Sequence, residues 1–152
     1  MEKQQLLDDN HCFACGKENP HGLQLKFEPI PDGVRAFFIP LKCHQGYKDI
    51  IHGGILTTLL DETMAQAAIF AGHFAVTAEI TVRFHNPLGI GERVRVDAKI
   101  GSIRHGLLDA EAGIFTVKDD KLIAHATAKL LLPSLKPAMQ RDRAGREGEK
   151  DS

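Results

Sequence analysis

Four consecutive segments in the second half of the chain alternate apolar and polar residues with a period of two. Successive side chains of a β-strand point to opposite faces of a sheet, so this period indicates strands with one covered face and one solvated face. Strands of this kind are typical of antiparallel sheets. The four predicted strands cover residues 75–87, 91–103, 106–117 and 122–133.

One amphipathic helix pattern stands before these strands, in residues 54–72. Its apolar side chains gather within about half of the helix circumference, as expected for a helix packed on a sheet. Asp61 lies at the border of this apolar arc, and Gly72 is expected to end the helix. Two shorter alternating segments, residues 23–28 and 34–40, precede the helix and are separated by a turn that contains Pro and Gly.

This order of elements predicts an α+β domain. When all six strands pair, they form one six-stranded antiparallel sheet, and the single long helix must cover it. A chain of 152 residues is one domain by size. We expect a flexible N-terminus at residues 1–10, the folded domain at residues 11–133, and a charged, disordered tail at residues 134–152.

Composition and charge exclude several classes of protein. The chain has 19 Lys and Arg against 20 Asp and Glu, so it lacks the basic surplus that a nucleic-acid-binding surface needs. Residues 50–76 are the longest apolar-rich stretch, but polar residues interrupt it too often for a membrane span. The first ten residues lack the apolar segment of a secretory signal. Because the cysteines number three, no complete disulfide framework forms, and we expect a cytoplasmic protein.

The segment most informative about function is His52-Gly53-Gly54, which leads directly into the predicted helix. The first N–H groups of a helix have no acceptor inside it and lie at the positive end of its dipole. They are therefore suited to polarise a carbonyl group or to hold an oxyanion, and two glycines let a ligand approach the backbone closely. Asp61, nine residues after His52, adds a carboxylate that can act as a general base or as a nucleophile.

The distance between these groups points to a dimer. Gly54 and Asp61 are separated by about 10.5 Å along a helix, whereas catalytic groups lie roughly 3 Å from the reacting atoms. One helix therefore cannot place both groups on one carbonyl carbon. Two helices related by a two-fold axis can, because each site then combines groups from both subunits. If both groups act together, we expect a homodimer with composite sites.

Three runs of sequence resemble a known family. The run HGGILTTLLDETMA is similar to the helix motif of hotdog-fold thioesterases of the PaaI type. The runs CFACGKENPHGLQLKF and HQGYKDIIHGG are similar to one branch of that superfamily, which includes the thioesterase domain of the carboxyl-terminal modulator proteins. The resemblance extends from about residue 11 to residue 133, which is almost the whole part of the chain expected to be ordered.

This resemblance implies a hotdog fold, in which the sheet wraps around one central helix, and the hydrolysis of an acyl-CoA thioester to a free carboxylic acid and CoA. It implies that the N–H of Gly53 polarises the thioester carbonyl and that Asp61 activates water or attacks the acyl carbon. Thr77 matches a hydroxyl residue that orients the acid or the water, and His52 matches a positioning histidine. Because Thr77 alternates with Glu79 on the polar face of its strand, its approach to Asp61 rests on the resemblance alone.

Three further residues are candidates for binding substrate. Gly54 follows directly after the oxyanion donor. Some relatives place Asn or Gln six residues before the histidine to hold the carbonyl; that position is Gly46 here, and Gln45 precedes it, so the role of Gln45 stays open. Arg104 lies in a predicted hairpin turn and is a candidate for binding the phosphates of CoA.

The resemblance implies acyl-CoA as the partner, with coenzyme A present only as part of the substrate and with no other cofactor. It also implies a homodimer and allows a dimer of dimers. Two alternatives stay open: a hotdog hydratase or dehydratase acting on acyl thioesters, and a non-catalytic acyl-CoA-binding module. Neither Asp61 nor Asp49 has the spacing from His52 that the hydratase motif requires. The acyl group, and the choice between CoA and acyl carrier protein, also stay open.

Cys12 and Cys15, with His11 and His21 nearby, offer four possible zinc ligands in one loop. A C-x₂-C pair normally needs a second pair of ligands at a typical spacing, and this loop lacks one. We therefore favour packed free thiols and no metal, with zinc as the alternative. Cys43 is expected to be a buried thiol.

Overall fold

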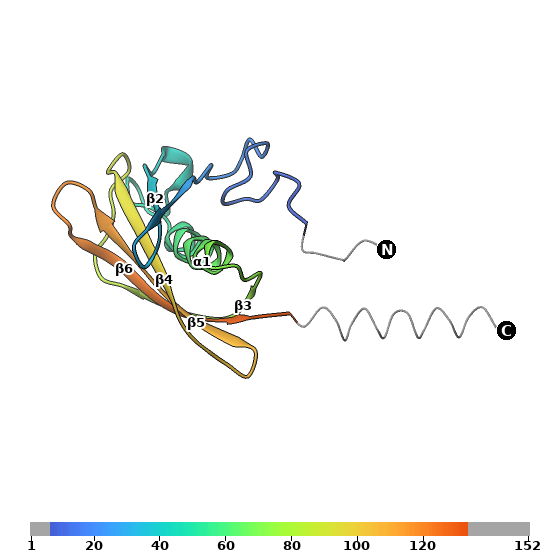
Figure 1. Cartoon of the computed structure of the whole chain (residues 1–152). Helices are drawn as coiled ribbons and strands as arrows, with labels where there is room; N and C mark the ends of the chain where they lie inside the picture. Colours follow the sequence, from blue (N-terminus) through green and yellow to red (C-terminus); the bar gives the residue numbers. More distant parts are fainter. Residues whose placement is uncertain (1–6, 134–152) are drawn as a thin grey trace, which may run out of the picture.

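The computed structural model describes residues 7–133, in which one antiparallel sheet of six strands curves around a single long helix (Figure 1). This architecture confirms the predicted α+β fold. No helix in this range is long and apolar enough to cross a membrane. The predicted tail and residues 1–6 lie outside the described residues. The elements are β1 (Phe27–Ile30), β2 (Gly33–Phe38), the short 3₁₀ helix η1 (Lys42–His44), α1 (Gly53–Phe70), β3 (Val76–Phe84), β4 (Val94–Arg104), β5 (Leu107–Thr116) and β6 (Leu122–Leu131).

The strands lie in the order β1-β2-β4-β5-β6-β3, and every neighbouring pair is antiparallel. β3 follows α1 in the chain but pairs with β6, at one edge of the sheet. The other side of β3 has no strand partner among residues 7–133. Figure 1 shows α1 inside the curve of the sheet, and side chains of α1 and β3 are in contact there.

Small side chains on the inner face of the sheet let α1 approach it closely. Ala98 on β4 pairs with Ala112 on β5, which in turn pairs with Ala126 on β6, and all three are buried. The helix places larger apolar side chains against them, so large and small residues face each other in the core. The buried residues of α1 are Leu56, Leu59, Leu60, Thr63, Met64, Ala67 and Ala68.

Gly72 ends the helix as predicted, just beyond its last residue, Phe70. The backbone of Gly72 has a φ of 91°, a conformation that favours glycine. Its N–H donates to the carbonyl of Ile69 at 2.9 Å, and the N–H of His73 donates to the carbonyl of Ala68 at 2.9 Å. These two bonds form a Schellman motif, which satisfies carbonyl groups that the last turn otherwise leaves free.

The first strand, predicted at residues 23–28, lies there only at Phe27 and Glu28, and residues 23–26 form no strand. Leu23 and Leu25 are buried, but their N–H groups donate to the carbonyl groups of Phe13 at 2.8 Å and Ala14 at 3.0 Å in the N-terminal loop. The alternating leucines therefore belong to an irregular segment that covers the core. β1 begins later and contains a proline, which an edge strand accommodates because part of its backbone needs no partner.

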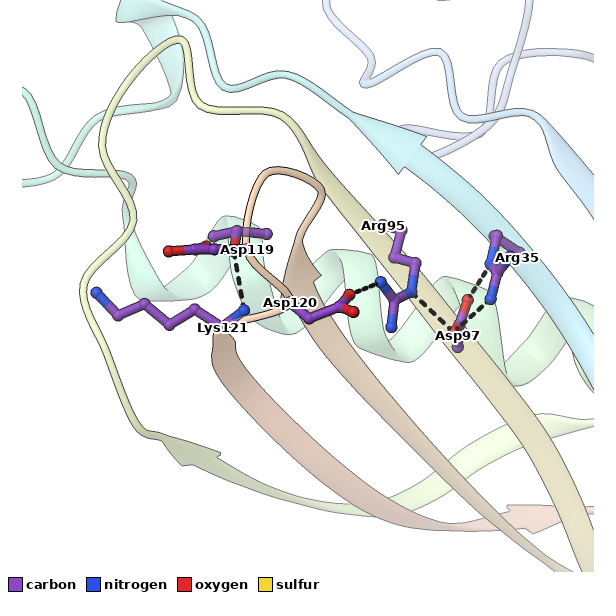
Figure 2. Close-up of polar contacts among 7 residues, drawn as sticks. Arg35, Arg95, Asp97, Asp119, Asp120 and Lys121 are labelled. Atoms are coloured by element: carbon purple, nitrogen blue, oxygen red, sulfur yellow. Dashed lines mark hydrogen bonds and ion pairs between the residues drawn. The ribbon is translucent and has the colours of Figure 1, made fainter.

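The outer face of the sheet carries a charged network. Asp97 on β4 accepts a hydrogen bond from Arg35 Nε at 2.6 Å and one from Arg95 Nε at 3.2 Å, and Arg95 also pairs with Asp120. Desolvation raises the pKa of Asp97, but the hydrogen bonds from the two guanidinium groups outweigh it, so the pKa lies below its ordinary value. Figure 2 shows Arg35, Arg95 and Asp97 on the strands and Asp120 on the turn between β5 and β6, with α1 behind them, so the network stands apart from the helix.

Replacing Asp97 by Asn is expected to lower the free energy of unfolding by about 1–2 kcal/mol at neutral pH, because two guanidinium groups lose their charged acceptor. A lowered pKa in the folded state adds stability above the unfolded pKa of about 3.9, and this contribution disappears as the pH falls through the folded pKa. Urea unfolding curves of the two proteins should therefore converge at acidic pH. Glu18→Gln, at an exposed carboxylate without an ion pair among residues 7–133, is the control. A stability difference that does not change with pH would contradict this assignment.

Candidate functional site

The ring of His52 caps the start of α1. Its Nδ1 accepts the N–H of Gly54 at 2.8 Å, so the proton of the neutral ring lies on Nε2. The carbonyl of His52 accepts the N–H groups of Ile55 at 3.0 Å and Leu56 at 3.3 Å. The cap thus occupies the amide of Gly54, which we expected to bind substrate.

The N–H of Gly53 has no acceptor among residues 7–133. It belongs to the first helical residue, at the positive end of the helix dipole. Gly53 lines a pocket of about 270 Å³ together with Leu56, Phe84 and Pro87. The ring of Phe84 lies against it, since a Cβ built on Gly53 would be 3.4 Å from Phe84 Cζ. The pocket therefore brings apolar surface next to an unpaired N–H.

A hydrogen bond from β3 holds the carboxylate of Asp61. Thr77 Oγ1 donates to Asp61 Oδ1 at 2.6 Å, and Asp61 is half-buried on α1. Oδ2 of Asp61 receives no hydrogen bond from the part of the chain that the structure describes. One carboxylate oxygen is thus oriented by the hydroxyl, and the other is available to accept a proton.

A β-bulge makes this contact possible. Thr77 pairs with Leu130, whereas Glu79 pairs with Lys129, so one extra residue, Ala78, stands between the two pairs. Without the bulge, Thr77 and Glu79 would share one face of the strand, as the sequence predicts. The bulge places Thr77 on the face of the buried Leu130, towards α1, and Glu79 on the face of the exposed Lys129. The expectation that Thr77 lies on the polar face is therefore wrong, and its contact with Asp61 is observed.

Gly53 and Asp61 lie near opposite ends of β3. Gly53 borders Phe84, the last residue of the strand, and Asp61 contacts Thr77, near its beginning. α1 therefore runs antiparallel to β3, beside the free edge of the sheet. The eight residues from Gly53 to Asp61 correspond to about 12 Å along the helix axis. The structure thus does not bring the two groups together within one chain.

The other predicted binding residues, Gln45 and Arg104, lie in different surroundings. Gln45 Oε1 accepts the N–H of Asp49 at 3.1 Å, which closes the loop before α1. Arg104 is exposed at the end of β4, in a hairpin whose two turn residues have φ values of 52° and 75°. Strand pairing places this hairpin at the same end of the sheet as Thr77, the end away from Gly53.

Glu62, the residue after Asp61, has contacts that the sequence analysis missed. Its carboxylate lies within 4.8 Å of the thiol sulfurs of Cys12 and Cys15. Burial, together with a hydrogen bond to Glu62, raises the pKa of the Cys15 thiol above its ordinary value. The sequence places Glu62 on the polar side of the predicted helix. No neighbouring residue indicates that the loop with Cys12 and Cys15 covers it. Cys43, expected to be buried, is exposed.

The sequence of this chain matches a known family over the residues that form this site. The sequence profile of the thioesterase superfamily matches residues 48–123, which is half of the chain. The chain belongs to the thioesterase superfamily. The matched range contains His52, Gly53, Asp61 and Thr77, so the groups described above lie within the part that carries the family pattern. This membership confirms the family predicted from the sequence.

Individual relatives share part of the sequence, and solved structures share the fold. The acyl-coenzyme A thioesterase THEM4 of Xenopus laevis is 30% identical over 93 residues, which are 61% of this chain and 42% of THEM4. The chain therefore spans less than half the length of this relative. The structure of zebrafish thioesterase superfamily member 2 has a TM-score of 0.70 at 19% identity, covering 82% of this chain and 93% of the other. The PaaI protein of E. coli has a TM-score of 0.66 at 20% identity, covering 72% of this chain and 83% of PaaI, so the hotdog fold is shared.

The capping role of His52 predicts the effect of two substitutions on stability. His52→Ala removes the acceptor of the Gly54 N–H and should lower the free energy of unfolding by about 1 kcal/mol. His52→Asn should retain most of the stability, because the Asn side-chain oxygen can accept the same N–H. Chemical unfolding of the two variants measures the difference. Equal losses in Ala and Asn would show that the ring contributes by packing and not by capping.

Proposed function

We propose that this protein hydrolyses an acyl-CoA thioester to a free carboxylic acid and CoA. Membership of the thioesterase superfamily and the similarity to an acyl-coenzyme A thioesterase support the reaction class. One observation carries the proposal: the two groups lie at opposite ends of the edge strand β3. Asp61, oriented by Thr77, lies near one end, and the unpaired N–H of Gly53 borders the other. A carboxylate and an oxyanion donor are the two groups that acyl transfer to water requires.

The two groups meet when two chains pair antiparallel along β3. In a pairing centred between Ile80 and Thr81, Thr77 of one chain lies opposite Phe84 of the other. Each Asp61 then lies at the level of the partner's Gly53, and the dimer has two equivalent sites. The edge itself favours such a partner, because Val76 is 40% and Phe84 is 53% exposed on it.

In this dimer, the thioester carbonyl accepts the N–H of Gly53 from one subunit. Asp61 of the other subunit takes a proton from a water molecule, and the resulting hydroxide adds to the carbonyl carbon. The tetrahedral intermediate collapses with cleavage of the C–S bond, CoA leaves as the thiolate and takes up a proton, and the acyl group leaves as a carboxylic acid. The hydroxyl of Thr77 keeps Asp61 in place for this step. The reaction needs no cofactor besides the coenzyme A of the substrate.

The compartment we propose is the cytoplasm, where thiols stay reduced. The cysteine count supports this, because three cysteines cannot form a complete disulfide framework within one chain.

Asp61→Asn is expected to lower kcat by about 100-fold or more, because the amide cannot take a proton from water. Acyl-CoA binding should persist, since the shape of the side chain is retained. Release of free CoA, followed with a thiol reagent across short, long and aromatic acyl-CoAs, measures the rate and identifies the acyl group. Glu79→Gln, on the outward face of β3, is the matched control. A near-normal rate in Asp61→Asn, or a change in enoyl absorbance without free CoA, would contradict the proposed hydrolysis.

The shared site predicts complementation between two inactive variants. Gly53→Pro removes the N–H at the first helical position, where proline fits the backbone, and should lower kcat about 10²–10³-fold. Gly53→Ala keeps the N–H and is the control for the added side chain. When Gly53→Pro and Asp61→Asn chains are mixed in equal amounts and allowed to exchange, roughly a quarter of the wild-type activity should return, because each mixed dimer has one intact site. Exchange without any regained activity, with mixed dimers confirmed by mass, would show that the sites are not shared.

A further inference from the structure

Two thiols and a carboxylate converge where the N-terminal loop crosses α1. The thiol sulfurs of Cys12 and Cys15 and a carboxylate oxygen of Glu62 all lie within 4.8 Å of one another. The three side chains are half-buried, so each is partly withdrawn from water. The hydrolysis proposed above uses none of them.

The loop that carries both cysteines has a fixed backbone. The N–H of Gly16 donates to the carbonyl of Cys12 at 2.8 Å, which closes a tight turn around the pair. A side chain at position 16 would be impossible here, since a Cβ would lie 2.4 Å from the backbone nitrogen of Cys12. The side chain of Gln24 holds the turn from outside, donating to the carbonyl groups of Gly16 at 3.0 Å and Asn19 at 2.6 Å. The turn of the backbone therefore fixes the positions of both thiols beside the helix.

The helix side of the cluster is also held in place. Gln66, one turn after Glu62, donates from Nε2 to Glu62 Oε1 at 3.1 Å and lies 4.0 Å from Cys15 Sγ. Glu62 is thus held beside the thiols. Two thiols alone need no such carboxylate to form a disulfide, whereas a bound cation does gain from a third, oxygen ligand.

We propose that Cys12, Cys15 and Glu62 bind one zinc ion. Thiolate sulfur selects zinc over magnesium and calcium, and a carboxylate oxygen completes a mixed set that zinc accepts. This ligand set differs from the alternative drawn from the sequence, because neither His11 nor His21 belongs to the cluster. The ion would tie the N-terminal loop to α1 one residue after Asp61, and its role is structural.

Metal analysis of the full chain, purified reduced and without a histidine tag, tests the site. We expect one zinc per chain by elemental mass spectrometry, and cobalt substitution should give a thiolate charge-transfer band. Cys12→Ser and Cys15→Ser should lose the zinc and the band. Glu62→Gln removes a direct ligand and should weaken binding by more than the roughly 10–100-fold that changes around a ligand typically cost. Cys43→Ser, at the exposed thiol outside the cluster, is the matched control and should keep both. A zinc-free protein with three reactive thiols, or a disulfide between Cys12 and Cys15, would overturn the proposal.

A measurement on the unmodified chain covers the case in which a variant fails to fold. Removing zinc with a chelator should lower the melting temperature by a few degrees, and zinc but not magnesium should restore it. A melting temperature that responds to neither treatment would overturn the structural role. Asp61→Asn should keep its full zinc content, so a failure of the metal proposal and a failure of the hydrolysis proposal are seen separately.

Discussion

The close packing of α1 on the alanine-lined face of the sheet is the constraint on which the other features depend. Ala98, Ala112 and Ala126 leave room for the leucines of the helix, and any larger residue there would push the helix outwards. Both ends of α1 are fixed as well, by the cap at its start and the Schellman motif at its end. The packing and the two caps fix the rotation of the helix in this structure, and Asp61 lies at the border between the buried arc and the edge strand β3.

The cap at the start of α1 determines which backbone N–H is available there. Four N–H groups there have no acceptor within the helix. The carbonyl of His52 accepts two of them, from Ile55 and Leu56, and its ring accepts the third, from Gly54. Only the N–H of Gly53 is left over among the described residues. By accepting the N–H of Gly54, the ring of His52 leaves the N–H of Gly53 as the amide that the proposed mechanism uses as its oxyanion donor.

Local periodicity was sufficient to predict α1 and the strands that cover it, because each of these elements buries one face along its whole length. It failed where a contact depends on residues distant in the chain. The bulge at Ala78 reverses the face on which Thr77 lies, and no alternation of apolar and polar residues records an inserted residue of this kind. The leucines at 23 and 25 alternate as a strand does, yet they are buried by pairing with the N-terminal loop. The contact of Glu62 with the two cysteines was invisible for the same reason, since the loop and the helix are far apart in sequence.

In the proposed dimer, the free edge of β3 joins the two subunits and also brings the catalytic groups together. An unpaired strand with exposed apolar side chains is a site of uncontrolled association unless something covers it. Pairing with a second copy covers the edge. Gly53 and Asp61 are about 12 Å apart along one helix, but the two-fold axis brings Gly53 of one subunit next to Asp61 of the other. The bulge contributes to both effects, because it turns Thr77 inward to orient Asp61 while Glu79 remains outside. If the sites are shared in this way, a substitution that breaks the β3 pairing abolishes turnover with every catalytic side chain intact, so the interface belongs to the active site as much as Asp61 does.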